Sequence, residues 1–167
     1  MSQALIASLH ASLALALASG LASGLASAQP IPVAQPIDGA KIYAATCNAC
    51  HQANGLGTPG QFPPLAGSEW VTGSEERLVR IILHGIVGEI EVEGEMFNGL
   101  MPTWGPTLRD EELAAVATYV RQSWGNKAAP VTTATVTRIR LANASRTKPW
   151  TAAELQQAPR TNPPTRF

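Results

Sequence analysis

The sequence predicts an all-α domain that is interrupted by one short β-hairpin and followed by an extended basic C-terminal tail. Three observations carry this prediction: apolar residues recur at helical spacing in three segments, acidic residues alternate with others in a fourth, and the charge changes sign after Gly125. The 167 residues suit one ordinary domain. Two cysteines exclude a disulfide-stabilised scaffold, and a formal net charge of zero argues against a nucleic-acid-binding protein.

Residues 1–28 have the pattern of a secretory signal peptide. An apolar run over residues 4–18 is followed by small residues and ends with Ala26-Ser27-Ala28, as at a cleavage site, although no Lys or Arg precedes the run. The run is short for a bilayer span. We therefore expect cleavage before Gln29 and a periplasmic protein; an uncleaved anchor, which would associate with a membrane, is the alternative. Residues 29–37 are rich in proline and uncharged, and predict an extended linker.

Two helices are predicted before the hairpin. Asp38 can cap a helix from Gly39 to about His51, because its carboxylate can accept hydrogen bonds from the first free backbone N–H groups. Ser74 can cap a second helix that ends at Gly85 and carries two glutamates in its first turn.

A third helix is predicted to open near Asp110, with its cap at Asp110 or Thr107. Its apolar positions fall on one helical face: Leu113, Val116, Ala117, Val120 and Trp124. Between the second and third helices, residues 89–95 alternate strictly between glutamate and other residues, and Gly94 lies at a favourable turn position. This pattern predicts a short hairpin.

The formal net charge is zero, but the acidic and basic residues are separated along the chain. Residues 38–125 carry eleven acids and five bases, whereas residues 126–167 carry seven bases and one acid. Within the tail, a helix is predicted from Thr132 or Thr133 to about Ser145, and Thr151 to Glu154 has the form of a capping box; residues 159–167 are expected to be disordered. The tail is thus partly helical, and it could be a solvated face, dock a partner, or fold back onto the acidic domain.

The chemistry-bearing motif is Cys47-Asn48-Ala49-Cys50-His51, the C-x-x-C-H pattern that attaches c-type haem. Residues three apart share a helical face, so both thiols can reach the two vinyl groups of one haem, and His51 can ligate the iron. A thioredoxin-like motif would need a βαβ context, and a zinc site would need more ligands. A structural disulfide is the remaining alternative.

A sixth iron ligand is expected downstream, with Met96, Met101 and His84 as candidates. Met101 is favoured because Pro102 follows it and fixes the backbone, while Gly99 permits a close approach to the ring. Met96 is expected to be a half-buried strand residue, and His84 to be an ordinary residue at a helix end.

The chain resembles class I c-type cytochromes over residues 38–125. In that family a glycine and an aromatic on the motif helix, here Gly39 and Tyr43, pack against an aromatic on the last helix, here Tyr119. The family also has P-x-L-x-G after the motif, matched by Pro63-Pro64-Leu65-Ala66-Gly67. The resemblance implies that the Pro63 carbonyl accepts the Nδ1 proton of His51 and that Leu65 packs on the haem.

The resemblance implies a one-electron carrier with one covalently bound haem c, ligated by His51 and Met101, rather than an enzyme. Short segments of the chain are most similar to bacterial mono-haem cytochromes that accompany periplasmic dehydrogenases or terminal oxidases. Such enzymes would be the redox partners of this protein. One alternative is a fixed relay subunit of a dehydrogenase, oxidase or photosynthetic complex. The other is a gas-binding or peroxidatic haem, which would require Met101 to be displaced.

Overall fold

Residues 36–158 are described by the computed structural model. The predicted signal peptide over residues 1–28, most of the linker over residues 29–37 and the end of the tail from residue 159 lie outside the described residues. None of the described helices is long and apolar enough to cross a membrane.

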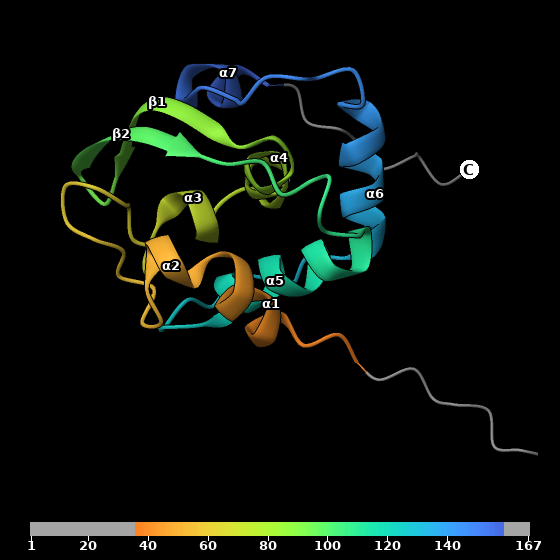
Figure 1. Cartoon of the computed structure of the whole chain (residues 1–167), viewed down its shortest axis with the longest axis horizontal. Coiled ribbons are helices and arrows are strands. Elements are labelled where there is room, and N and C mark those ends of the chain that lie inside the picture. Colours follow the sequence, from red (N-terminus) through yellow and green to blue (C-terminus); the bar gives the residue numbers. More distant parts are fainter. Residues whose placement is uncertain (1–35, 159–167) are drawn as a thin grey trace, which may run out of the picture. The chain divides into compact units, whose positions relative to one another are not determined.

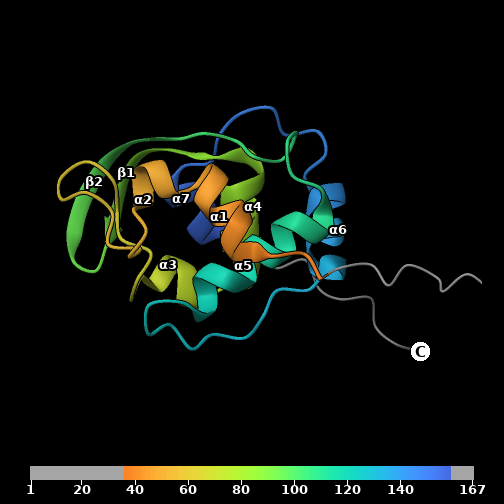
Figure 2. The same cartoon turned by 60° about the horizontal axis from the view of Figure 1, so that its bottom comes forward.

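Helices dominate the described residues, which also contain one two-stranded antiparallel sheet (Figures 1 and 2). The prediction of a mainly helical domain with one hairpin therefore agrees with the structure, although the hairpin makes the fold not strictly all-α. The elements in chain order are α1 (Gly39–Thr46), α2 (Asn48–His51), α3 (Glu69–Thr72), α4 (Glu75–His84), β1 (Ile86–Val92), β2 (Glu95–Met101), α5 (Asp110–Gln122), α6 (Thr133–Ala142) and α7 (Ala152–Gln157).

Helix α1 packs across α5. A Cβ atom on Gly39 would collide with the backbone oxygen of Ala115, so glycine permits the close approach of the two helices. One turn later the rings of Tyr43 and Tyr119 lie 5.4 Å apart between centroids, and Trp124 adds a third ring to the cluster. The packing that the resemblance implied for Gly39, Tyr43 and Tyr119 is confirmed.

Helix α4 passes through the centre of the described residues. It begins at the predicted cap, where the Ser74 hydroxyl accepts a hydrogen bond from the Arg77 amide, and it ends at Gly85 as predicted. Six consecutive residues, from Leu78 to Leu83, are buried, so other parts of the chain cover the helix on more than one face. This position lets α4 contact both α5 and the segments that follow it in the chain.

The hairpin is longer than the sequence predicted. Its strands pair from Ile86 with Met101 to Val92 with Glu95, and the turn is at Glu93-Gly94. Because residues alternate between the two faces, Ile86, Ile90, Val92 and Phe97 share the inner face, whereas Glu89 and Glu91 lie on the outer face. The prediction found only the charged part, since residues 96–101 carry no alternating charge to reveal the second strand.

Helix α5 begins at Asp110 as predicted, but its N-cap and its C-terminal end differ from the prediction. The N-cap is Arg109, whose backbone amide donates to the Glu112 carboxylate at 2.9 Å, so the expected caps Asp110 and Thr107 are wrong. The helix ends at Gln122, and Trp124 lies beyond it with a φ of 52°. The indole N–H of Trp124 donates to the Ala53 carbonyl, so this residue packs on the loop after α2 rather than continuing the helical face.

Residues 126–158, which we call the folded extension, do not form an extended tail. Helix α6 packs against α4 and α5, and α7 packs against β1. Five apolar side chains of the folded extension are less than a tenth exposed: Val131, Val136, Ile139, Trp150 and Leu155. The expectation of a separate basic tail missed this burial because the apolar positions are sparse among threonines and arginines.

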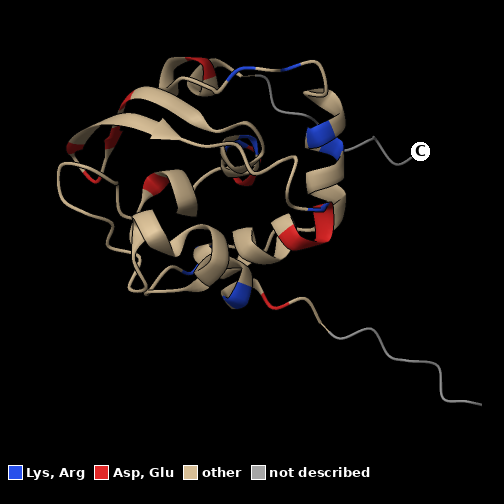
Figure 3. Cartoon of the chain, viewed as in Figure 1, with Lys and Arg blue, Asp and Glu red and all other residues tan. Residues whose placement is uncertain are grey.

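Of the three possibilities for the tail, folding back is the one seen in residues 126–158. Arg138 of α6 lies 2.8 Å from a carboxylate oxygen of Glu76 on α4, and Arg140 lies 2.6 Å from Asp110 at the start of α5. Figure 3 shows the basic residues of α6 beside that acidic helix start, away from the hairpin. The extension therefore pairs with acids of α4 and α5, and the hairpin glutamates do not pair with it.

Candidate functional site

Cys47 lies at a break between two short helices, and Cys50 lies within the second of them, so the single helix predicted from Gly39 to about His51 is interrupted at Cys47. Cys47 ends α1, and α2 restarts at the next residue, with the His51 amide donating to the Cys47 carbonyl at 3.0 Å. Both thiols are free and half-buried, and both line the same cavity. Burial raises the pKa of the Cys47 thiol, so it is held as a neutral thiol facing an apolar space.

His51 lines the cavity beside the two thiols. Its Nδ1 lies 2.9 Å from the carbonyl oxygen of Pro63, and an Nδ1–H that donates to this carbonyl leaves Nε2 with a free lone pair. Burial lowers the pKa of His51 and outweighs the opposing effect of the bond to Pro63. A buried, neutral and oriented imidazole is the form that binds a metal.

The loop after α2 holds the Pro63 carbonyl in place. The Leu65 and Ala66 amides both donate to the Gly55 carbonyl, and a Cβ atom on Gly57 would collide with the backbone of Phe62 and Pro63. Leu65 itself lines the cavity. The loop thus presents one carbonyl to the imidazole and one apolar side chain to the cavity.

Asn126 fastens the same loop to the end of α5. Its amide nitrogen donates to the carbonyls of Leu65 and Val120, and its amide oxygen accepts from the Gly67 amide. The side chain is buried, so these bonds are protected from water. No spacing rule predicts this role, because the loop partners Leu65 and Gly67 lie about sixty residues away in sequence.

Of the three expected candidates for a sixth ligand, the structure brings only Met101 to the cavity. Met101 is the last residue of β2 and lines the cavity from the hairpin side. Met96 is 60% exposed, so the expectation of a half-buried residue is wrong. Its register partner Glu91 is also exposed, which places this pair on the outer face of the hairpin.

His84 lies away from the cavity. Its ring meets the Trp150 ring edge-on, with 6.4 Å between centroids, and it is absent from the cavity lining of the described residues. Burial lowers the pKa of His84, and the nearby guanidinium groups of Arg146 and Arg140 lower it further. These contacts give His84 a packing role against the folded extension.

The cavity between His51 and Met101 has a volume of about 430 Å³ and a predominantly apolar lining. Helices α3, α4 and α5 supply aliphatic and aromatic side chains to it, and the inner face of the hairpin closes one side. The residues that line it beyond the expected site include Trp70, Val71, Leu78, Ile82, Ile90, Val92, Phe97, Trp104, Val116 and Val120. Such a lining excludes water and suits a large flat apolar ligand.

Two glycines leave room for a ligand in the hairpin wall. Gly88 and Gly99 pair across the strands and both line the cavity, and no atom lies within 4 Å of a Cβ atom built on either. The site fits a covalently attached iron porphyrin, because it combines two thiols, an imidazole with a free Nε2, a thioether and an open apolar space. The sequence did not predict that the hairpin forms a wall of the cavity, although Phe97, Gly99 and Met101 follow the strand period of two.

Comparison with known proteins supports this interpretation of the site. Residues 34–120 match the family described as "Cytochrome C oxidase, cbb3-type, subunit III". Cytochrome c-552 of Thermus thermophilus is 48% identical over 93 residues, which cover 53% of this chain and 70% of that protein.

Subunits of larger assemblies also match. The cytochrome c subunit of a quinone alcohol dehydrogenase from Gluconacetobacter polyoxogenes is 37% identical over 107 residues, or 62% of this chain and 22% of that protein. The cbb3-type cytochrome c oxidase subunit FixP of a Bradyrhizobium strain is 35% identical over 91 residues, or 53% of this chain and 28% of that protein. The match thus spans about a quarter of each of these two subunits.

Proposed function

Because this chain belongs to the class I c-type cytochromes, and is thus an electron-transfer protein rather than a catalytic enzyme, we propose that it is an exported one-electron carrier. It holds a single haem on Cys47 and Cys50, with His51 and Met101 as axial ligands. The observation that carries this proposal is the placement of Cys47, Cys50, His51 and Met101 around one apolar cavity.

The bound haem supplies the Fe(III)/Fe(II) couple. The thiols of Cys47 and Cys50 fix the ring, and the Pro63 carbonyl holds His51 with its Nε2 toward the cavity. The Met101 thioether favours the ferrous state and raises the reduction potential relative to a second histidine. With His51 and Met101 both holding the iron, no position would be left for a substrate, and the group would supply electron exchange alone.

The partners are redox proteins. The matched relatives from Gluconacetobacter and Bradyrhizobium are named as cytochrome subunits of a dehydrogenase and of an oxidase. Their names favour a second candidate, in which this chain is a fixed relay subunit of such a complex. Size-exclusion chromatography of native extract separates the two: a free carrier elutes at its own mass, and a subunit elutes with its complex.

The first prediction concerns haem content and export. The mass of the protein purified from cells with haem-maturation enzymes should equal that of the polypeptide from Gln29 plus one haem, because one C-x-x-C-H motif is present. Intact-protein mass spectrometry measures this. An unmodified polypeptide mass from such cells would contradict attachment, and a mass that includes residues 1–28 would contradict cleavage.

The second prediction concerns the sixth ligand. Met101→Ala should abolish the weak far-red charge-transfer band of methionine-ligated ferric haem and open the iron to imidazole or carbon monoxide. Met96→Ala is the matched control, because Met96 is exposed on the outer face of the hairpin. This variant should keep the charge-transfer band and should not open the iron to imidazole or carbon monoxide. A gas-binding or peroxidatic haem would instead bind carbon monoxide rapidly in the wild-type protein.

A further inference from the structure

We propose that the folded extension braces the chain around Met101, and that Arg140 is the positioning residue of this brace. By holding residues 102–109, which connect β2 to α5, Arg140 keeps the Met101 thioether on the iron. This inference rests on the proposed ligation by His51 and Met101. A thioether is a neutral and weak donor, so its binding depends on how firmly the chain presents it.

Arg140 of α6 makes two hydrogen bonds to the connection after Met101 and a third to Asp110, the first residue of α5. Its Nη1 donates to the Gly105 carbonyl at 2.7 Å, its Nη2 to the Leu108 carbonyl at 2.8 Å, and its Nε to the Asp110 carboxylate at 2.6 Å. A planar guanidinium can serve three acceptors at once, which an ammonium on a lysine stem cannot do with the same geometry. Arg140 therefore holds the middle and the C-terminal end of the connection from the side of the extension.

The same connection is tied to α4 on its other side. The Trp104 amide donates to the Ile82 carbonyl at 3.0 Å, and the Gly105 amide to the Leu83 carbonyl at 3.1 Å. The Thr103 hydroxyl donates to Leu83 as well. Gly105 is thus held between α4, through its N–H, and α6, through its carbonyl, four residues after the proposed ligand.

The folded extension also reaches the strand that pairs with Met101. The Trp150 amide donates to the Gly85 carbonyl at 3.0 Å, and the Trp150 carbonyl accepts from the Val87 amide at 2.8 Å. These bonds enclose Ile86, the register partner of Met101. The extension consequently supports Met101 through β1 as well as through residues 102–109.

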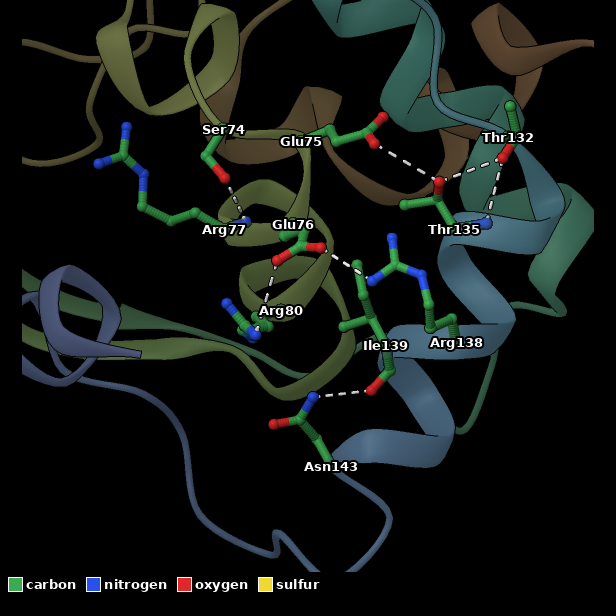
Figure 4. Close-up of polar contacts among 10 residues, drawn as sticks. All are labelled: Ser74, Glu75, Glu76, Arg77, Arg80, Thr132, Thr135, Arg138, Ile139 and Asn143. Atoms are coloured by element: carbon green, nitrogen blue, oxygen red, sulfur yellow. Dashed lines mark hydrogen bonds and ion pairs between the residues drawn. The ribbon is translucent and has the colours of Figure 1, made fainter. Parts of the chain in front are cut away.

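A second arginine on the same helix provides the control. Arg138 lies two residues before Arg140, but its ion pair is with Glu76 of α4, which also pairs with Arg80 (Figure 4). In Figure 4 this contact belongs to the α4–α6 interface, together with the bond from Thr135 to Glu75. Removing Arg138 removes its ion pair with Glu76 and leaves the bonds of Arg140 to residues 102–109 in place.

The test is imidazole binding to the ferric holoprotein, because imidazole must displace Met101 to bind. Arg140→Ala should bind imidazole at least about tenfold more tightly than wild type, as expected when hydrogen bonds to a charged group are lost. Arg138→Ala should bind it with nearly wild-type affinity. Arg140→Lys keeps the charge and should resemble Arg140→Ala, and it serves as the test if the alanine variant does not fold.

A urea titration distinguishes positioning from general stability. In Arg140→Ala the far-red band should disappear at a lower urea concentration than the midpoint of unfolding measured by circular dichroism. In Arg138→Ala the loss of the band and the unfolding midpoint should move to lower urea concentration by the same amount. Equal imidazole affinities in Arg140→Ala, Arg138→Ala and wild type would overturn the proposal, as would full restoration by Arg140→Lys. If Met101→Ala leaves the wild-type band intact, the ligation itself is wrong, and that outcome is independent of Arg140.

Discussion

At the scale of single residues, the hairpin wall of the cavity is thinnest where Gly88 and Gly99 pair. Their neighbours on the inner face, Ile86 and Met101 on one side and Ile90 and Phe97 on the other, are large, and the glycines leave a gap between them. The gap is not filled by other parts of the described chain. The gap is therefore open to the cavity in which the proposed haem would bind.

A side chain at residue 99 should compete with the haem and not with the polypeptide. Gly99→Val should lower the free energy of unfolding of the haem-loaded protein by about 1–3 kcal/mol, the usual cost of overpacking. Asn98→Val, one residue earlier on the exposed outer face, should change it by no more than about 0.5 kcal/mol. Urea unfolding of both variants measures the difference, and equal effects would show that the gap does not face the haem.

Local spacing explains which site residues could be predicted from the sequence. Cys47, Cys50 and His51 fall within one helical turn, so a short motif is enough to find them. Asn126 and Arg140 act on backbone atoms that are distant in sequence, and no spacing rule reports such contacts. Met101 was favoured over Met96 because of its flanking proline and glycine, and its strand position was not foreseen.

At the scale of elements, α6 is the part of the chain that the sequence described least well. Its threonine and valine content is unfavourable for an isolated helix, and its arginines suggested a solvated surface. Tertiary packing overrides both, because Val136 and Ile139 are fully buried against α4 and α5. By contrast, α4 agrees with the prediction because a strong cap and a regular apolar face coincide in it, and α5 agrees in its start and its apolar face but not in its cap.

Helix α6 contains a matched pair of residues that tests whether it is part of the core. Ile139 is 0% exposed and Leu141 is 71% exposed. Ile139→Ala should therefore lower the free energy of unfolding by about 2–5 kcal/mol, and Leu141→Ala should change it by less than about 0.5 kcal/mol. Thermal or urea unfolding checks this, and a loose basic tail would instead give two small and equal effects.

At the scale of the whole molecule, folding back sorts the charges into paired and unpaired sets. Arg138 and Arg140 pair with Glu76 and Asp110, which removes those acids from the exposed surface. Four glutamates of the hairpin remain exposed, and no ion pair within residues 36–158 includes them: Glu89, Glu91, Glu93 and Glu95. Figure 3 shows acidic residues along the hairpin, the element whose inner face lines the cavity.

Unpaired acids beside a redox centre should attract cationic reagents and repel anionic ones. Reduction of the ferric protein by hexaammineruthenium(II) should therefore slow by roughly two- to fivefold at low salt in the double variant Glu89→Gln/Glu91→Gln, because two nearby charges are removed. Oxidation of the ferrous protein by ferricyanide should speed up. Both changes should fade as salt shortens the screening length to about 10 Å at 0.1 M.

Stopped-flow rates across a salt series measure these effects. Glu111→Gln is the control, since Glu111 is an exposed acid at the start of α5 that does not line the haem cavity. It should change the rates with both reagents less than the hairpin variant does. If the two variants had equal effects, electrons would leave by a surface other than the hairpin, and its glutamates would act only through the net charge of the protein.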